Sequence, residues 1–271
     1  MTFPIWINLG FTKLHPHILF EALAYFIGFR VYLMTRSKDK LPVEQGMWVI
    51  VGAILGAAVG SKVLYWLEDP LKTIENWSSY TYLMEGKTII GGLLGGLIGV
   101  EWIKKRIGIT RSTGDDMALP IILGMAIGRI GCFMTGLDDH TYGTPTSWGT
   151  GVDFGDGIPR HPTQLYEITF LLLLGASLLY WKRRMNMRTI PSLSATRTIP
   201  EGALFQLFMT GYLLFRFGID FIKPTPHPFL GLNNIQLASL VGLIYYVSVL
   251  CKWVGKTHGH YKEAYHHVNK K

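Results

Sequence analysis

Residues 128–167 read GRIGCFMTGLDDHTYGTPTSWGTGVDFGDGIPRHPTQLYE, and they are the one place where polar, charged and glycine residues gather densely in this apolar chain. The apolar run MALPIILGMA leads into Arg129, and a second run, ITFLLLLGASLLYW, follows Glu167. A charged side chain inside a membrane span costs about 3 kcal/mol or more, and it usually faces a partner or a cavity. The stretch therefore predicts a lipid-handling site between two membrane-spanning segments.

The composition favours an integral membrane protein. Apolar residues make up 49% of the chain and charged residues 16%, whereas a soluble domain usually has about 25% charged residues. Stretches that approach the roughly 20 apolar residues needed to cross a bilayer lie at about 18–35, 46–66, 88–103, 117–136, 164–181, 203–222 and 235–254. We therefore expect an all-α integral membrane protein with about seven transmembrane helices, a single polytopic domain over 1–271 and a cytoplasmic tail at 255–271.

The net charge of +8 does not indicate a nucleic-acid-binding protein, because the basic residues gather in alternate loops. The positive-inside rule places such loops in the cytoplasm, so we expect an external N-terminus and a cytoplasmic C-terminus. No positively charged segment precedes the first apolar run, and that run is expected to direct targeting itself. The basic loop residues are Arg36, Lys38, Lys40, Lys104, Lys105, Arg106, Arg111, Lys182, Arg183, Arg184 and Arg188, followed by several lysines after residue 251.

We expect no metal and no cofactor. The two cysteines, Cys132 and Cys251, both fall within expected spans. They match neither a secreted-type disulfide framework nor a zinc motif. For Cys132, packing is the preferred interpretation over a covalent nucleophile.

Two further groups of polar residues lie in or beside the apolar runs. Arg216 and Asp220 are at i and i+4, so they can pair on one helix face, and a structural ion pair is the alternative to a functional role. A second intramembrane arginine gives two guanidinium groups, whose planar donors suit a phosphate. The run after residue 160 opens with His161, Gln164, Tyr166 and Glu167. Such polar groups beside an apolar run indicate a functional site rather than a solvated helix face.

Glycines recur every four residues in two neighbouring runs. Gly52, Gly56 and Gly60 lie in the second run, and Gly91, Gly95 and Gly99 lie in the third. This spacing places hydrogen-sized side chains on one helix face and lets two backbones approach closely. Helix packing is therefore expected here, rather than a phosphate-binding loop.

Several motifs, in this order, resemble the bacterial prolipoprotein diacylglyceryl transferases. They are GRIG at 128–131, YGTPTSWG at 142–149, RHPTQLYE at 160–167 and RFGIDFIKP at 216–224, with Asp115 at the spacing of an aspartate that precedes GRIG in the family. The resemblance implies transfer of a diacylglyceryl group from phosphatidylglycerol to the lipobox cysteine thiol of a prolipoprotein signal peptide. It also implies a multi-pass protein of the bacterial inner membrane.

The resemblance implies specific roles for the polar residues. Arg129 would hold the lipid phosphate, and Arg216, beside Asp220, would bind the head group or gate the substrate. The outer face of the site would be shaped by His161, Gln164, Tyr166 and Glu167.

The sequence departs from the family at four positions, one of which is a first-span tyrosine that has no clear match, although Glu21 and Tyr25 are both near. Ile90 stands where the family has a histidine, Cys132 where it usually has asparagine, and Leu137 where it has glutamate. The missing histidine leaves the catalytic base open, and the candidates are Glu21, Asp138, Asp139 and His140.

Two other functions stay open on the same residues. A non-catalytic protein that binds or moves phospholipid would also keep the two arginines, and a transferase could use a different acceptor. An ion channel or transporter is weakly supported, because the chain shows no paired inverted halves and no repeated broken helices.

Overall fold

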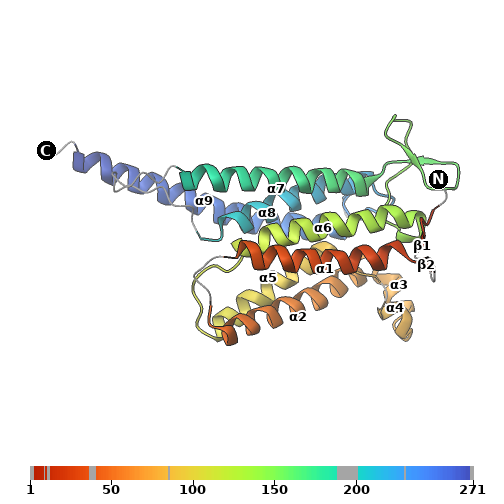
Figure 1. The fold of residues 1–271 in the computed structure, drawn as a ribbon, viewed down its shortest axis with the longest axis horizontal. Coiled ribbons are helices and arrows are strands. Elements are labelled where there is room, and N and C mark those ends of the chain that lie inside the picture. Colours follow the sequence, from red (N-terminus) through yellow and green to blue (C-terminus); the bar gives the residue numbers. More distant parts are fainter. Residues whose placement is uncertain are drawn as a thin grey trace.

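The computed structural model describes residues 3–8, 10, 13–36, 41–84, 86–187, 201–228 and 230–268. The described part is a bundle of long helices that run along a common direction (Figure 1). The long helices are α1 (Pro16–Thr35), α2 (Val43–Glu68), α5 (Ile89–Arg106), α6 (Asp115–Thr135), α7 (Thr163–Met187), α8 (Ala203–Ile219) and α9 (Asn234–Val268).

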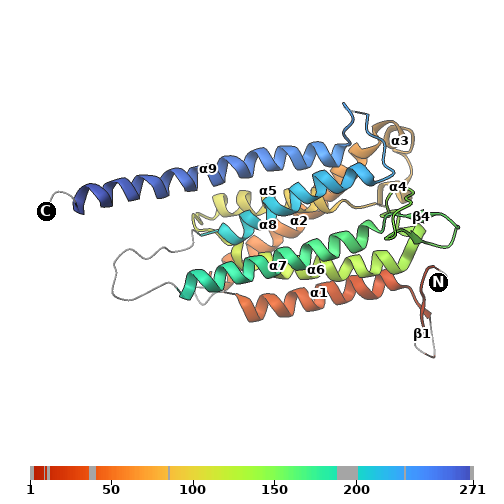
Figure 2. The same cartoon turned by 90° about the horizontal axis from the view of Figure 1, so that it is seen from above.

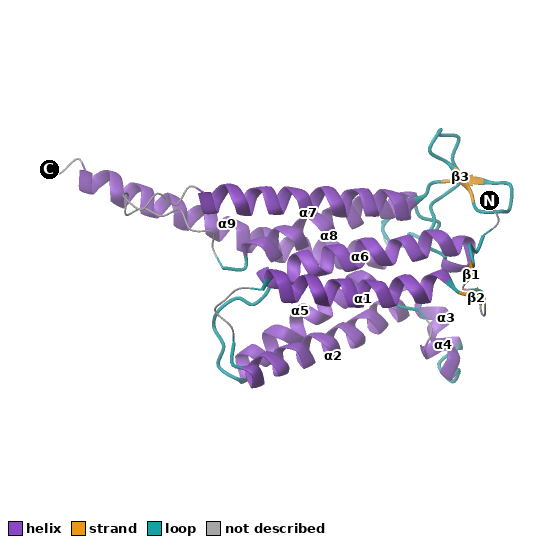
Figure 3. Ribbon diagram, viewed as in Figure 1, coloured by secondary structure: helices purple, strands orange, loops and turns teal. Residues whose placement is uncertain are grey.

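Short elements gather at one end of the bundle (Figure 3). Two small antiparallel sheets add to the expected all-α architecture, one pairing β1 with β2 and the other pairing β3 with β4. The elements are β1 (Ile7–Asn8), β2 (Lys13–Leu14), α3 (Pro70–Glu75), α4 (Tyr80–Met84), η1 (Gly136–Asp139), β3 (Val152–Asp153), β4 (Pro159–Arg160) and η2 (Asp220–Ile222).

Six helices in the described part of the chain are long and apolar enough to cross a membrane. They cover Pro16–Thr35, Val43–Glu68, Asp115–Asp139, Thr163–Arg184, Ala203–Ile222 and Asn234–Cys251. The expected span at 88–103 forms α5, whose last turns carry four charged residues, Glu101, Lys104, Lys105 and Arg106. Seven spans therefore stays a prediction. α9 continues through Val268, so most of the expected tail extends the last helix.

The bundle has two chemically different ends. The loop end is where β1–β4, α3 and α4 lie, and the N-terminus is there (Figures 1 and 2). At the opposite, basic end, α1, α5 and α7 finish and α2, α6 and α8 begin, and α9 extends beyond its neighbours (Figure 2). The basic loops identified in the sequence connect helices at this end.

Asp115 ties two helices together at the basic end. Its Oδ1 accepts hydrogen bonds from the backbone N–H groups of Leu204 (2.9 Å) and Phe205 (3.2 Å), and its Oδ2 accepts one from Gly202 (2.7 Å). A carboxylate in this position satisfies N–H groups that a helix start leaves without partners. Asp115 therefore has a structural role, and it does not pair with Arg129.

The expected glycine contact forms between α2 and α5. A Cβ atom added at Gly56 would collide with the carbonyl oxygen of Gly95, and one added at Gly95 would collide with that of Gly56. The same close approach joins Gly60 to Gly91 and Gly52 to Gly99. Backbones this close leave no room for a side chain, so the packing interpretation is confirmed.

We expect Gly95→Ala to destabilise the protein by about 1–3 kcal/mol, because the added methyl group must push two helix backbones apart. The matched control is Gly92→Ala, where the nearest atoms to an added Cβ are 3.8 Å away, an ordinary contact distance. Thermal unfolding of the two variants in detergent measures the difference. Equal stability of Gly95→Ala and Gly92→Ala would contradict the contact.

Candidate functional site

Two buried arginines share one buried carboxylate near the loop end. Nε of Arg129, on α6, lies 2.9 Å from Oε2 of Glu167, on α7, and Nη1 of Arg216, on α8, lies 3.4 Å from the same oxygen. The three side chains are only 7%, 3% and 4% exposed, respectively. A buried charge without a partner is strongly destabilising, so Glu167 both neutralises and orients the two guanidinium groups.

Other charged groups extend this arrangement along α8. Nη2 of Arg216 donates to Oδ1 of Asp220 at 2.9 Å, and Nζ of Lys223 lies 3.7 Å from the same oxygen. Burial and the nearby charge of Arg216 lower the pKa of Lys223 from 10.5 to about 8. The Tyr212 hydroxyl donates to Oε1 of Glu167 at 2.6 Å. We call these residues the arginine cluster: Arg129, Glu167, Tyr212, Arg216, Asp220 and Lys223.

The charges of the arginine cluster favour an anion. With Lys223 protonated, the named residues of the cluster hold three cations and two carboxylates, and the carboxyl group of Glu68 at the end of α2 lies close enough to interact with Asp220, Lys223 and Arg216. A phosphodiester carries a single negative charge and accepts hydrogen bonds from guanidinium groups. The cluster is therefore suited to a phospholipid head group.

Gln164 has unused hydrogen-bonding capacity beside this cluster. It lies one helical turn before Glu167 on α7 and is only 1% exposed. Neither its Nε2 nor its Oε1 has a hydrogen-bond partner among the described residues. Because buried polar atoms are nearly always paired, the amide is available for a polar group of a ligand.

The loop 137–163 forms a cap that is held by backbone hydrogen bonds. The backbone N–H of His161 donates to Thr144, and the carbonyl of His161 accepts from Gly143. The ring of His161 packs against Trp148, and its Nδ1 lies 3.2 Å from the Tyr166 hydroxyl. The contacts of His161 and Tyr166 therefore lie within the cap, rather than with the arginines.

The cap also has an exposed ion pair. Nη1 of Arg160 donates to Oδ1 of Asp156 at 2.6 Å, and this guanidinium lowers the pKa of Asp156 below its usual range. The pair stabilises the turn between β3 and β4, outside the arginine cluster.

A second polar group lies beside Arg129. Nδ1 of His17, on α1, is 3.1 Å from Oδ1 of Asp139, and its Nε2 is 3.8 Å from Oε2 of Glu21. Nη1 of Arg129 lies 3.7 Å from Sγ of Cys132. Of the four candidate bases, Glu21 and Asp139 thus both contact His17, whereas Asp138 and His140 are exposed.

The family model for prolipoprotein diacylglyceryl transferase matches residues 4–254. The chain belongs to this family. It is 29% identical to the phosphatidylglycerol–prolipoprotein diacylglyceryl transferase of Bordetella parapertussis over 246 residues, which cover 84% of this chain and 85% of the relative. The transferase of the same name from Vibrio vulnificus is 29% identical, with 96% and 94% of the two chains covered.

The structure brings together only some of the residues that the family resemblance selects. Arg129, Glu167, Arg216 and Asp220 form one connected cluster. Ile90, which stands where the resemblance expects a histidine, is 1% exposed and packs in the hydrophobic core.

Sequence reasoning missed three members of the two polar groups. Tyr212 lies four residues before Arg216, so the shared helix face was a usable signal. His17 follows a proline just before the first apolar run, and Lys223 comes directly after the sixth run. Neither position has a local pattern that indicates a site.

Proposed function

We propose that the protein transfers a diacylglyceryl group from phosphatidylglycerol to the lipobox cysteine thiol of a prolipoprotein, in the bacterial inner membrane. The observation that supports this most is the pair of buried arginines held on Glu167 beside the unpaired amide of Gln164. Family membership supplies the reaction class, and the cluster supplies a place for the lipid phosphate.

The reaction needs charge stabilisation on the leaving group. When the thiol sulfur attacks the glyceryl carbon, the bond from that carbon to a phosphate oxygen breaks and glycerol phosphate leaves with the electron pair. Fixed donors aimed at this developing charge stabilise the transition state more than the ground state. Arg129 and Arg216 are the donors that we assign to this role, with Glu167 fixing their orientation.

The proposed orientation places the arginine cluster near the outer surface. Arg129 is close to the end of α6, Glu167 is close to the start of α7, and Arg216 is close to the end of α8, all toward the loop end. The basic loops connect helices at the opposite end, which the positive-inside rule assigns to the cytoplasm. Lipobox cysteines would therefore reach the site from the outer side.

Complementation of a bacterial strain depleted of its own diacylglyceryl transferase tests the proposal. We expect the full-length protein to restore lipoprotein maturation, and Arg129→Ala to abolish the rescue while the variant stays in the membrane, because the remaining arginine cannot hold the phosphate alone. Lipoprotein size on gels and an immunoblot of the membrane fraction are the two measurements. No rescue by a correctly inserted wild-type protein would contradict transfer to this acceptor.

A second candidate function is phospholipid binding without chemistry. The observation that favours it is the buried, apolar side chain of Ile90, which stands where the resemblance expects a histidine. On this alternative, purified protein retains phosphatidylglycerol, Arg129→Ala releases it, and no labelled diacylglyceryl group reaches a lipobox peptide. Detection of the labelled peptide would exclude this alternative.

A further inference from the structure

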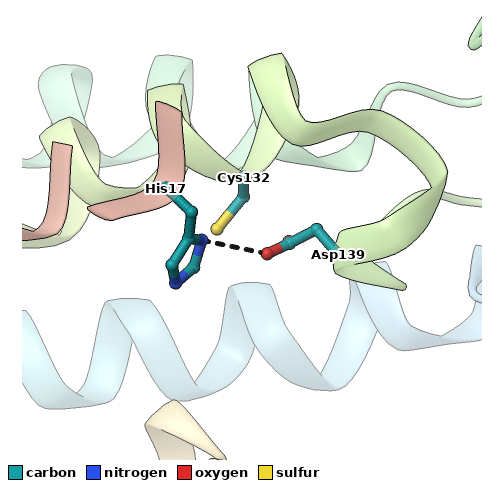
Figure 4. A group of neighbouring side chains, drawn as sticks. All are labelled: His17, Cys132 and Asp139. Carbon is teal, nitrogen blue, oxygen red and sulfur yellow. Dashed lines mark ion pairs between the residues drawn. The ribbon is translucent and has the colours of Figure 1, made fainter. Parts of the chain in front are cut away.

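Three metal-ligating side chains from separate segments converge near the loop end. His17 lies in the first turn of α1, Cys132 lies in α6 and Asp139 ends η1 (Figure 4). Their ligand atoms, one from each residue, all lie within 4.8 Å of one another. Figure 4 shows the imidazole, the thiol and the carboxylate pointing toward a shared space, with the His17–Asp139 ion pair drawn as a dashed line.

The distances among these atoms are compatible with a shared ion. Nδ1 of His17 is 3.1 Å from Oδ1 of Asp139, yet it makes no hydrogen bond of good geometry with any described residue. Nitrogen and oxygen ligands of a tetrahedral zinc ion lie about 3.3 Å apart, given metal–ligand bonds of about 2.0–2.1 Å. A zinc–sulfur bond of about 2.3 Å would place the sulfur about 3.6 Å from the other two ligand atoms, which is inside the 4.8 Å limit on the present separations.

The surrounding contacts are those that support metal ligands. Oδ2 of Asp139 accepts a hydrogen bond from Oγ1 of Thr141 at 2.5 Å, which fixes the carboxylate. The second ring nitrogen of His17 faces Glu21 at 3.8 Å. A carboxylate on the far side of a ligating histidine orients the ring and raises its basicity. The side chain of His17 is 41% exposed, so an ion can enter.

We propose that His17, Cys132 and Asp139 bind one Zn²⁺ ion, whose fourth position takes the thiol of the acceptor cysteine. Histidine nitrogen, cysteine sulfur and carboxylate oxygen are all zinc ligands, and catalytic zinc sites use three protein ligands with one open position. The role in thiol activation rests on the proposed transferase function. It gives this chain a means to generate a thiolate although Ile90 stands where the resemblance expects a histidine.

The transfer of the diacylglyceryl group to the zinc-bound thiolate needs no further reactant. The acceptor thiol loses its proton to water as its sulfur binds zinc, because a metal-bound thiol is deprotonated. The sulfur then forms a bond to the glyceryl carbon of the phospholipid, and the carbon–oxygen bond to phosphate breaks. The electron pair leaves with glycerol phosphate, whose charge faces Arg129. That residue also contacts Cys132 at 3.7 Å, so the two polar groups adjoin at the point of reaction.

The sequence predicts no metal, because no motif places ligands at regular spacing. The site depends on α1 packing against α6, which brings His17 beside Cys132, and on the turn of η1, which returns Asp139 to the same point. The proposal therefore replaces the packing interpretation of Cys132.

Metal content of the purified full-length protein is the first test. The protein is prepared in detergent with a tag that contains no histidine, incubated with Zn²⁺ and desalted. We expect Cys132→Ser to hold about one zinc ion per chain less than the wild type, and Cys251→Ser, at the other cysteine, to hold the wild-type amount. All three proteins keep the four histidines after residue 257, so zinc bound by those cancels in the difference. Equal zinc in Cys132→Ser and the wild type would overturn the site.

Cobalt substitution is the second test, and it reports on the ligands and on the acceptor. Co²⁺ bound by Cys132 should give a sulfur-to-cobalt absorption band that is lost in Cys132→Ser and weakened in Asp139→Asn. Addition of a lipobox peptide should roughly double the band, since a second thiolate joins the first. A peptide with serine in place of the cysteine is the control. If the cysteine peptide leaves the band unchanged, the thiol-activating role is overturned.

The transfer assay separates this proposal from the proposed function. Zinc bound through Cys132, with no diacylglyceryl transfer by the wild type, would contradict the proposed function and leave the metal site intact. Transfer at the wild-type rate by a zinc-free Cys132→Ser protein would support the proposed function and overturn the role of the metal in thiol activation. Thermal unfolding of Cys132→Ser and of the conservative Asp139→Asn variant checks that each variant is folded when its loss of metal binding or transfer is measured.

Discussion

Replacement of Glu167 by glutamine is expected to reduce diacylglyceryl transfer by at least about 100-fold, the effect of losing a fixed electrostatic contact in a transition state. The carboxylate is the common partner of Arg129 and Arg216, so its removal leaves two buried cations facing each other. Their repulsion moves both guanidinium groups away from the positions that we assign to phosphate binding. Transfer of labelled diacylglyceryl groups to a lipobox peptide in membranes measures the loss.

The same substitution should lower the stability by several kcal/mol. Removing one partner of a buried ion pair typically costs about 3–5 kcal/mol, because the remaining charge is left uncompensated. The matched control is Tyr212→Phe, which removes only the hydroxyl that donates to Oε1 of Glu167. A lost hydrogen bond to a charged group costs about 1.5–3 kcal/mol, so this variant should unfold at an intermediate temperature. Transfer by Glu167→Gln equal to that of Tyr212→Phe would contradict the orienting role of the carboxylate.

The sequence predicts the local part of the arginine cluster and misses the long-range part. The pairing of Arg216 with Asp220 follows from helix periodicity alone, since the two residues are one turn apart. The ion pair between Arg129 and Glu167 joins α6 to α7. The whole cap separates these two helices in the sequence. Periodicity shows that each residue lies in or beside an apolar run, but it does not show which faces meet.

The same limit explains the missed histidine. Glycine spacing predicts that α2 and α5 pack closely, because the signal is carried by the contact residues themselves. No comparable signal connects His17 to Asp139, whose approach depends on the packing of α1 and on a short turn after α6. Polar residues near the ends of spans therefore identify a region, and the three-dimensional arrangement assigns the partners within it.

Replacement of Arg129 by lysine is expected to lower transfer by about 100-fold although the positive charge remains. Lysine can keep an ion pair with Glu167, but a single ammonium group lacks the planar fork that contacts two oxygen atoms at once. It also lacks the second nitrogen that reaches Cys132. The substitution therefore tests whether the geometry of the guanidinium, rather than its charge alone, stabilises the leaving phosphate.

The matched control for this substitution is Arg160→Lys in the cap. Arg160 pairs with exposed Asp156 at 2.6 Å, and exposed ion pairs contribute only about 0–1 kcal/mol, so transfer should stay near the wild-type rate. Both variants are assayed with labelled phosphatidylglycerol, and retained phospholipid is measured on the purified proteins. Loss of transfer with retained phospholipid in Arg129→Lys would place the role of the guanidinium in the transition state. Wild-type transfer by Arg129→Lys would show instead that charge alone suffices, and the assignment of Arg129 as a two-point phosphate ligand would be wrong.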